Sequence, residues 1–485
     1  MKGRAAAKPF SHQTFISLCG QDPEACWQAY CALLQQVAAQ EGKENELQGR
    51  LKQDSSNSHR PPSADYAKRR RNNSRERSGK KPGGQPGHRG CTLRQVPDPD
   101  RTVVLVPKTC PCGHHFEGGQ TPAKLERRQV FDIPPPKLEV TEYQAATLIC
   151  PNCGTPNRGI FPEGVDAPVK YGPLIRSIAV NLNVYNYVPF ARGAELFRDV
   201  FGVPLSPGSM VNILADAAGN AKPIVEEIKG AIQAAEVAHF DETGSRSEGR
   251  RDWLHVAATE QLTVYFHHQK RGTAAMDELG ILPTFTGYAI HDHWAPYYTF
   301  TQSTHRQCCT HLLRDTQGVH DTFDLQWPLE MKRHLKDAKA KVDAAKATGK
   351  TALSESELEA INQRYQAILR DGRAETPPPP PKASGKRGGH KRGKAISLLD
   401  RLGKNPEQIL GFTTDFRVPF GNNLAERDIR MAKLKQKVSG GFRSKPGAEN
   451  FCLIRSVIST TVKQTGKVMN AVAALVKGVA PALRI

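Results

Sequence analysis

A change in hydrophobic period at Glu236 constrains the fold of this chain more than any other feature of its 485 residues. Before that point apolar residues recur at helical spacing, and after it apolar and polar residues alternate, as is typical of β-strands. The predicted strands lie at 237–240, 253–259, 262–267 and 286–291, with a helix at 273–279. The pattern therefore predicts a three-stranded β-meander followed by a helix and a fourth strand.

Two aspartates stand on separate strands in this region. Asp241 comes after the apolar run of the first predicted strand, and the fourth predicted strand ends at Asp292. A carboxylate beside a core is costly unless its charge is paired, and two carboxylates side by side repel unless a cation lies between them. Mg²⁺ or Mn²⁺ ions would remove both costs and could activate a water or hydroxyl for attack on phosphorus. Taken alone, each aspartate is better explained as the cap of a turn.

A third acid stands in a strongly basic segment. Asn422 or Asn423 can cap a helix that continues past this acid. One face of that helix carries a carboxylate followed by three cations, namely Glu426, Arg430, Lys433 and Lys437. Such a face could complete a metal site and then follow a phosphate backbone, although a solvated helix with one salt bridge has the same spacing. The glycine pair Gly440-Gly441 that follows would let the backbone approach a phosphate closely.

The net charge of +20 is concentrated in three blocks of the sequence. Residues 68–94, 382–404 and 427–445 hold ten, eight and seven basic residues, with one acidic residue in each block. Because positive and negative charges nearly cancel in the rest of the chain, the three blocks are typical of segments that contact a polyanion. The first block has almost no apolar side chains that could form a core, which predicts a mobile arm. Its positive charge exceeds what a solvated linker needs, so we expect the arm to contact nucleic acid.

Two close cysteine pairs flank a compact unit with β-like runs at 128–133 and 138–148. Together they offer the four-sulfur shell that zinc prefers, and they are Cys110, Cys112, Cys150 and Cys153. The first pair has one intervening residue instead of two, so His114 or His115 could replace a thiolate. Four buried free cysteines or a decayed zinc site are the alternatives. Eleven cysteines spread over a long chain do not suggest a disulfide framework.

Residues 171–235 are predicted to be helical. Within them a helix at 194–201 ends at 202–205, and Ser206-Pro207 begins a second helix. A helix, a tight turn with glycine and a Ser-capped second helix form the outline of a helix-turn-helix, whose second helix reaches DNA. An ordinary helical hairpin has the same outline.

The N-terminal residues 24–51 show a weak helical pattern that Gly42 interrupts, which predicts either a short oligomerising helix or a marginal amphipathic one. No stretch reaches the ~18–20 uninterrupted apolar residues that a membrane helix requires, and residues 1–10 lack the apolar core of a signal peptide. We therefore expect a cytoplasmic protein without a membrane partner.

Three long motifs relate the chain to a known family. The segments AHFDETG, HDHWAPY and NNLAERDIRMAKLKQKVSGGFRS, in that order, resemble the catalytic core of transposases of the insertion sequence 66 family, a branch of the DDE transposases. SSNSHRPPSAD and KKPGGQPGHRG resemble the family's N-terminal arm, the four-cysteine unit its zinc-binding domain, and KAISLLDRL the region before its third acid. The resemblance covers about residues 54–480. Cys308 and His311 resemble a C-x-x-H pattern that follows the second acid in several DDE transposase families.

The resemblance implies a multidomain α/β protein with a ribonuclease-H-like core, a mixed β-sheet with helices. Strands one and four of that core would carry Asp241 and Asp292, a later helix would carry Glu426, and the three acids would bind two Mg²⁺ (or Mn²⁺) ions. A zinc-ribbon-like unit with structural Zn²⁺ and a helix-turn-helix region would precede the core. Residues 325–370 and the proline and basic stretch after them would form a helical insertion and a linker.

The implied function is that of a DNA transposase of a bacterial insertion sequence, acting on the nucleoid. It would bind the terminal inverted repeats of its element, cleave the DNA and join the ends to target DNA by in-line phosphoryl transfer. The partners would be both DNAs, further copies of the chain and small companion proteins of the same element. The alternatives are an architectural or regulatory DNA-binding protein, and a metal-dependent nuclease that does not join ends.

The expected domains follow from these assignments. They are an N-terminal helical segment 1–53, a basic arm 54–100, a zinc-binding-like domain 101–165, a helix-turn-helix-like domain 170–235, the first part of the core 236–320, the helical insertion and linker 321–400, the second part of the core 401–447 and a C-terminal helical element 448–485. The residues expected to contact DNA are Arg69, Arg70, Arg71, Lys80, Lys81, Ser209, Asn212, Arg427, Arg430, Lys433, Lys437 and Arg443. Cys308 and His311 could bind metal, contact DNA or pack.

Overall fold

The computed structural model describes residues 22–51, 57, 85, 87, 90, 92–116, 122–376 and 393–485. The predicted DNA-contacting residues Arg69, Arg70, Arg71, Lys80 and Lys81 lie outside these ranges, as does the part of the second basic block before residue 393. The chain divides into two compact units, one of Met1–Asn72, Ala167–Gly193 and Ser206–Ile485, and the other of Asn73–Asp166 and Ala194–Leu205.

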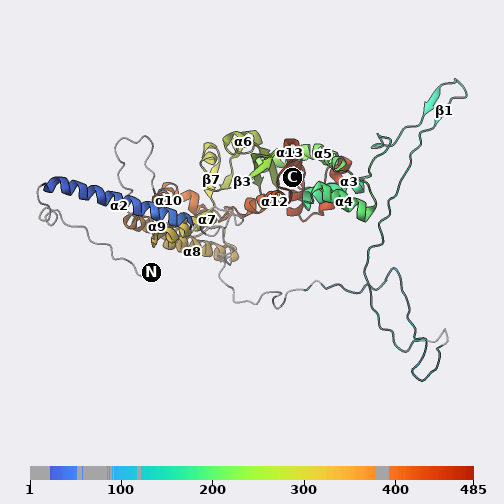
Figure 1. The fold of residues 1–485 in the computed structure, drawn as a ribbon, viewed down its shortest axis with the longest axis horizontal. Helices are drawn as coiled ribbons and strands as arrows, with labels where there is room; N and C mark the ends of the chain where they lie inside the picture. Colours follow the sequence, from blue (N-terminus) through green and yellow to red (C-terminus); the bar gives the residue numbers. More distant parts are fainter. Residues whose placement is uncertain are drawn as a thin grey trace. The chain divides into compact units, whose positions relative to one another are not determined.

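A five-stranded mixed sheet lies at the centre of the larger unit (Figure 1). Its strands are β3 (Val237–Ser247), β4 (Arg250–Ala258), β5 (Thr263–His268), β6 (Tyr288–His291) and β7 (Thr304–Gln307), in the order β5-β4-β3-β6-β7. β3, β4 and β5 are antiparallel neighbours, which confirms the predicted meander. β6 runs parallel to β3, and β7, which the sequence did not predict, runs parallel to β6.

Helices that precede, connect and follow these strands complete this part of the larger unit. They are α3 (Pro173–Val180), the π-helix η2 (Asn181–Tyr185), α5 (Pro207–Gln233), α6 (Thr273–Leu279), the 3₁₀ turns η3 (Leu282–Thr284) and η4 (Ala295–Thr299), α12 (Asn423–Ser439), α13 (Lys445–Lys463) and α14 (Val468–Lys477). α12 lies against β3 and β4, and α13 lies against β5 and α5. The helix predicted at 273–279 is confirmed as α6.

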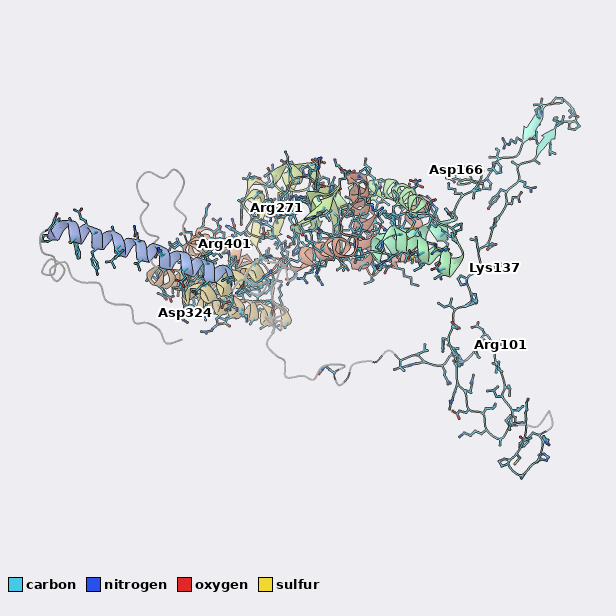
Figure 2. All side chains as sticks on the ribbon, viewed as in Figure 1. Arg101, Lys137, Asp166, Arg271, Asp324 and Arg401 are labelled. Atoms are coloured by element: carbon cyan, nitrogen blue, oxygen red, sulfur yellow. The ribbon has the colours of Figure 1, made fainter. Side chains whose placement is uncertain are left out.

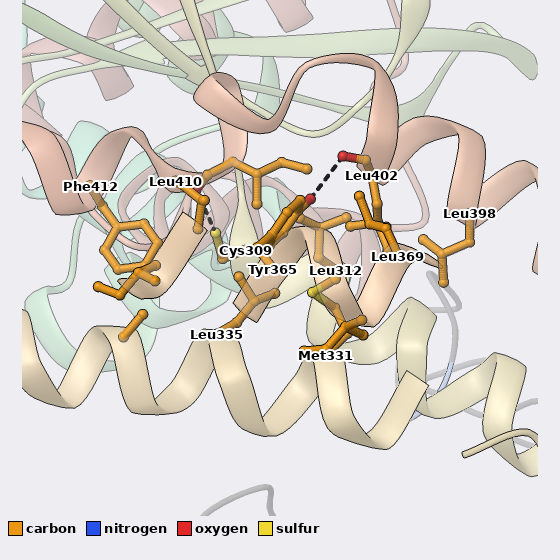
Figure 3. Packing of buried hydrophobic residues seen from close by; sticks show 14 of the residues in the cluster. Cys309, Leu312, Met331, Leu335, Tyr365, Leu369, Leu398, Leu402, Leu410 and Phe412 are labelled. Atoms are coloured by element: carbon orange, nitrogen blue, oxygen red, sulfur yellow. Dashed lines mark hydrogen bonds between the residues drawn. The ribbon is translucent and has the colours of Figure 1, made fainter. Parts of the chain in front are cut away.

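Helices between β7 and α12 form a second apolar core (Figure 3). They are α7 (Cys309–Phe323), α8 (Trp327–Ala347), α9 (Glu355–Glu375), α10 (Lys394–Lys404) and α11 (Pro406–Thr414). Trp327 of α8 and Tyr365 of α9 are buried in it, and the Tyr365 hydroxyl donates to the carbonyl oxygen of Leu402 over 2.9 Å. The insertion predicted at 325–370 is therefore helical, and it shares one core with α7, α10 and α11.

The N-terminal helix α2 runs without a break over Pro23–Leu51 and contacts α7. The prediction that Gly42 interrupts it is wrong, because one glycine costs a helix only about 1 kcal/mol. None of the helices within the described ranges has the length and apolar composition needed to cross a lipid bilayer.

The smaller unit holds little regular structure. Its strands β1 (Thr147–Ile149) and β2 (Pro156–Arg158) form one hairpin. The β-like runs predicted at 128–133 and 138–148 are wrong except at the start of β1, and their apolar side chains, such as Val130 and Val140, are exposed. Without a partner strand to cover them, these runs gain nothing from becoming strands.

The two helices predicted around residue 205 are present, as α4 (Phe190–Phe201) and α5. α5 begins after Ser206, whose hydroxyl accepts a hydrogen bond from the Ser209 backbone nitrogen over 3.0 Å. Gly202 in the connection has a φ of 66°, a backbone conformation that favours glycine. The DNA-binding role of this pair of helices stays a prediction.

Candidate active site

Asp241 and Asp292 lie on neighbouring parallel strands. Asp241 stands within β3, paired with Val256 of β4, which confirms that it lies on the first predicted strand. Asp292 directly follows β6. His239 of β3 pairs with Ile290 of β6, and the same register two residues further brings the aspartates opposite each other. Since side chains alternate along strands, both aspartates lie on one face of the sheet.

The charges around Asp241 make it an unusual carboxyl group. Burial raises its pKa well above the ordinary value, and the charges of Glu242, Glu426 and Asp292 raise the pKa further. One Asp241 oxygen accepts a hydrogen bond from the backbone nitrogen of Glu242 over 2.9 Å. Asp292 accepts one from the backbone nitrogen of Trp294, also over 2.9 Å. The structure thus brings Asp292 and Glu426 close enough to Asp241 for their charges to act on it.

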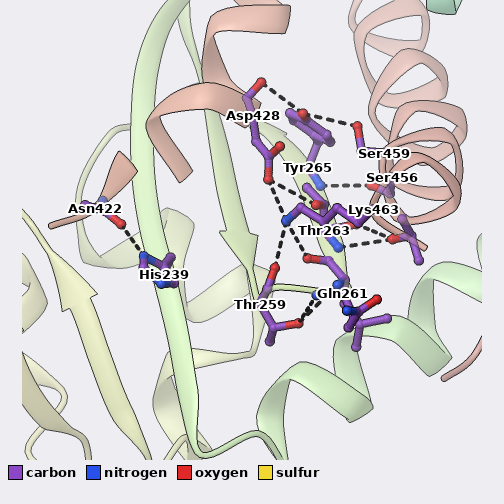
Figure 4. A network of polar contacts seen from close by, with 12 residues as sticks. His239, Thr259, Gln261, Thr263, Tyr265, Asn422, Asp428, Ser456, Ser459 and Lys463 are labelled. Atoms are coloured by element: carbon purple, nitrogen blue, oxygen red, sulfur yellow. Dashed lines mark hydrogen bonds and ion pairs between the residues drawn. The ribbon is translucent and has the colours of Figure 1, made fainter. Parts of the chain in front are cut away.

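Asn422 fixes the position of the third acid. Glu426 lies in the first turn of α12, and its backbone nitrogen donates to the carbonyl oxygen of Asn422 over 3.1 Å. The buried Asn422 amide donates to the carbonyl oxygen of Phe240 over 2.7 Å and faces Nδ1 of His239 at 2.9 Å (Figure 4). Asn422 is at the predicted cap position, but its side chain binds β3 instead of capping the helix. The start of α12 is thereby tied to the residue before Asp241.

Cys308 and His311 lie against Glu426. Nδ1 of His311 and Nη2 of Arg314 are each 3.6 Å from its Oε1, and Nη2 of Arg430 is 3.8 Å from its Oε2. Cys308, His311 and Glu426 each place a potential ligand atom within 4.8 Å of the other two. Burial raises the pKa of the Cys308 thiol to about 11, and its sulfur accepts a hydrogen bond from the Asn422 backbone nitrogen over 3.0 Å. Both residues therefore surround the third acid.

The cations predicted on α12 differ in their surroundings. Lys433 donates to the carbonyl oxygen of Gly244 over 2.6 Å, so it holds α12 to β3. The others are exposed, namely Arg427, Arg430, Lys437 and, beyond the helix, Arg443. Of the residues predicted on α5, Asn212 is exposed and Ser209 is half-buried.

The glycine pair after α12 packs on protein. The nitrogen of Phe442 donates to the carbonyl oxygen of Arg246 over 2.8 Å, and a Cβ on Gly441 would lie 2.7 Å from that oxygen. The close approach that Gly441 permits is to the end of β3, which does not support the predicted approach to a phosphate.

Comparison with known families identifies the chain. Residues 169–450, more than half of the sequence and inclusive of all three acids, match the family model described as "Transposase IS66 family". The chain belongs to the IS66 transposase family. Residues 107–154 match the zinc-finger binding domain of transposase IS66, and residues 21–94 match a family of unknown function (DUF6444). No curated protein matches the chain at a significant level.

The IS66 zinc-finger match covers the four predicted zinc ligands. Each cysteine pair forms a turn, and the pKa of the Cys112 thiol is lowered by a hydrogen bond from the backbone of His114 and by Cys110. Hydrogen bonds from Thr155 lower the pKa of Cys153 in the same way. Within the described residues the two pairs are not gathered into one group of three or more donors, and neither His114 nor His115 joins them.

Three residues of this IS66 transposase near the acids are functional candidates that the sequence did not predict. They are Glu242, on the other face of the sheet from Asp241, and its two hydrogen-bond donors Arg271 and Tyr297. The one signal in the sequence was the second acid of the Asp241-Glu242 pair, because neighbouring residues of a strand point to opposite faces.

Proposed function

We propose that the chain cleaves DNA at the ends of its element and joins those ends to target DNA, with Asp241, Asp292 and Glu426 as the catalytic carboxylates. The convergence of these acids from β3, the end of β6 and the start of α12 carries the proposal, since the chain belongs to a transposase family. If Asp241 and Asp292 only capped turns, nothing would bring Glu426 to them, because Glu426 lies more than 130 residues further along the chain.

The sheet supports a ribonuclease-H-like core. In the order β5-β4-β3-β6-β7 the first three strands of this sheet along the chain, β3 to β5, form an antiparallel meander, and β6 and β7 run parallel to β3. Asp241 then belongs to the first strand and Asp292 follows the fourth, as the family resemblance implies. The helices α8 and α9 form an insertion between the second and third acids.

The donor atoms fit hard divalent cations. Oε1 of Glu426 is buried and accepts no hydrogen bond from any described residue. Burial and the negative charges of Glu242, Glu426 and Asp292 raise the pKa of Asp241, and a divalent cation between the carboxylates would offset their repulsion. Asp241, Asp292 and Glu426 would hold two Mg²⁺ or Mn²⁺ ions. When bound, such ions would activate the attacking hydroxyl and stabilise the oxygen that leaves phosphorus.

The chain's other residues would hold DNA and the acids in place. Asn422 keeps Glu426 beside the strand that carries Asp241. The exposed cations Arg427, Arg430 and Lys437 would bind the phosphates of the strand that reacts, and the basic arm and α4–α5 would bind the element ends. The cysteine pairs would hold a structural Zn²⁺ in the DNA-binding region that the zinc-finger match indicates.

Replacement of Asp241 tests this function. Asp241→Asn should lower Mg²⁺-dependent cleavage of element-end DNA by at least about 100-fold, because a metal ligand is lost, and leave the affinity for that DNA unchanged in a gel-shift assay. Asp277→Asn, an equal change of charge at an exposed position of α6, should cleave as the wild type does. Wild-type cleavage by Asp241→Asn would rule out the catalytic assignment.

A further inference from the structure

We propose that Glu242 and Arg271 are positioning residues, which fix the loop that carries Asp292 against the strand that carries Asp241 from the opposite face of the sheet. The inference rests on the proposed function, because it assigns these residues to the geometry of the proposed metal site. Neither residue belongs to the three predicted acids or to the residues expected to contact DNA.

Glu242 points away from the carboxylate cluster. It follows Asp241 on β3, so its side chain lies on the other face, where Phe240 packs against Phe285 and Tyr297 with ring centroids 5.8 and 6.5 Å apart. The Glu242 side chain is only 2% exposed. A carboxylate at such a position is costly unless both of its oxygens have partners.

Both oxygens of Glu242 are engaged, and by different segments. Oε1 accepts hydrogen bonds from Nε and Nη2 of Arg271 over 2.8 and 2.6 Å. Oε2 accepts one from the Tyr297 hydroxyl over 2.5 Å. Arg271 lies between β5 and α6, and Tyr297 lies in η4, five residues after Asp292. Glu242 therefore joins β3 to the loop of the second acid and acts as a support rather than a metal ligand.

Arg271, which is labelled in Figure 2, makes a second connection to the same loop. Its guanidinium carbon lies 3.9 Å from the ring centroid of Trp294 and 5.1 Å from that of Trp253. The backbone nitrogen of Trp294 donates to Asp292. An unbroken path of contacts thus runs from β3 through Glu242, Arg271 and Trp294 to Asp292.

The geometry of arginine is essential to this path. Only a planar guanidinium can give two hydrogen bonds to a carboxylate and stack between two rings, so lysine would keep the charge and lose the fixed orientation. Groups that orient metal ligands in this way typically change metal affinity or activity by about 10–100-fold when they are replaced. Loosening the path should therefore weaken metal binding without removing any ligand.

Binding of Mn²⁺ to the full chain, followed by electron paramagnetic resonance of the free ion, tests the inference. Arg271→Lys and Glu242→Gln should each raise the Mn²⁺ dissociation constant about 10-fold or more, and the double variant should not bind much more weakly than the weaker single variant. Asp428→Asn is the matched control, because Asp428 is a half-buried acid that pairs with Lys463 over 2.9 Å at the β5 edge (Figure 4). It should bind Mn²⁺ as the wild type does.

Cleavage at several Mg²⁺ concentrations gives a second readout. High Mg²⁺ should restore cleavage by Arg271→Lys, whose ligands are all present, and should not restore Asp241→Asn. If both Arg271→Lys and Glu242→Gln bind Mn²⁺ with wild-type affinity, the inference is wrong. If Glu242→Gln does not fold, the Mn²⁺ affinity of Arg271→Lys is the test. If Asp241→Asn itself binds Mn²⁺ normally, the proposed metal site fails instead, so the two failures are distinguishable.

Discussion

Asn422 shows how a residue without charge can set the geometry of a carboxylate site. We predict that Asn422→Ala lowers the free energy of unfolding by about 1–3 kcal/mol, because the buried carbonyl oxygen of Phe240 and the ring of His239 lose a partner. Cleavage should fall more than about 10-fold, as Glu426 is no longer tied to β3.

Asn423→Ala is the control for this prediction, since Asn423 is the next residue of the chain and is exposed. Urea unfolding and a cleavage assay compare the two variants. Equal stability and equal cleavage of Asn422→Ala and Asn423→Ala would show that the side chain of Asn422 does not position the third acid.

Lys435 is a buried cation whose charge costs stability. Burial lowers its pKa to about 8, and its amine makes long contacts of 3.4–3.5 Å to Asn183 and lies 5.9 Å from the ring centroid of Phe190. Below pH 8 the amine is charged in both the folded and the unfolded state. As pH rises from 8 towards 10.5 the folded state loses its proton first, so the stability of the wild type should increase.

Replacement of Lys435 tests this pH dependence. Lys435→Met should raise the free energy of unfolding at pH 7 by roughly 1–3 kcal/mol and should lack the additional increase between pH 8 and 10. Urea unfolding at pH 7 and 9.5 measures both effects. A variant that is less stable than the wild type at pH 7 would contradict this interpretation of Lys435.

At the scale of elements, the inserted helices depend on close packing. A Cβ on Gly372 of α9 would lie 2.9 Å from Cδ2 of Leu399 and 3.0 Å from Cγ of Trp327. Gly372→Ala should therefore lower the free energy of unfolding by about 1–2 kcal/mol. The destabilisation from overpacking is partly offset because alanine favours a helix more than glycine does. Gly219→Ala in α5, where nothing lies within 4 Å, should raise it by up to about 1 kcal/mol. Equal effects of the two substitutions on the thermal midpoint would contradict the packing at Gly372.

The sequence predicted those elements whose pattern is local. β3, β4, β5 and β6 alternate visibly, and α6 matches its predicted bounds. β7 was missed because its four residues, Thr304–Gln307, are mostly polar and become a strand only by pairing with β6. The error at 128–133 has the opposite cause, since an alternating run without a partner strand stays irregular.

The candidate site likewise contains residues that the local sequence indicates and contacts that it does not. The sequence singles out Asp241, Asp292 and Glu426 because each is a carboxylate among apolar or basic neighbours, and their catalytic role stays a prediction. The contacts of Glu242 with Arg271, 29 residues away, and of Asn422 with Phe240, 182 residues away, could not be predicted. Such contacts depend on how the strands and α12 pack in three dimensions, and local sequence patterns do not predict that packing.

At the scale of the whole molecule, the charge of +20 should govern DNA affinity. Each basic residue that neutralises a phosphate contributes about 0.9 to the slope of log affinity against log salt concentration. We predict that Arg69→Ala, Arg70→Ala and Arg71→Ala together reduce the slope for non-specific duplex DNA by roughly 2–3. Fluorescence anisotropy between 50 and 300 mM salt measures it, and an unchanged slope would exclude these arginines from the DNA contact.

Strand transfer from pre-cut element ends tests the central claim most directly, because it isolates the joining step that distinguishes a transposase from a nuclease. In the presence of Mg²⁺ the wild type should join the pre-cut ends to target DNA. Asp241→Asn, Asp292→Asn and Glu426→Gln should each bind the ends and yield no joined product. Joining at the wild-type level by any of these variants, or cleavage of uncut ends without joining by the wild type, would contradict the account.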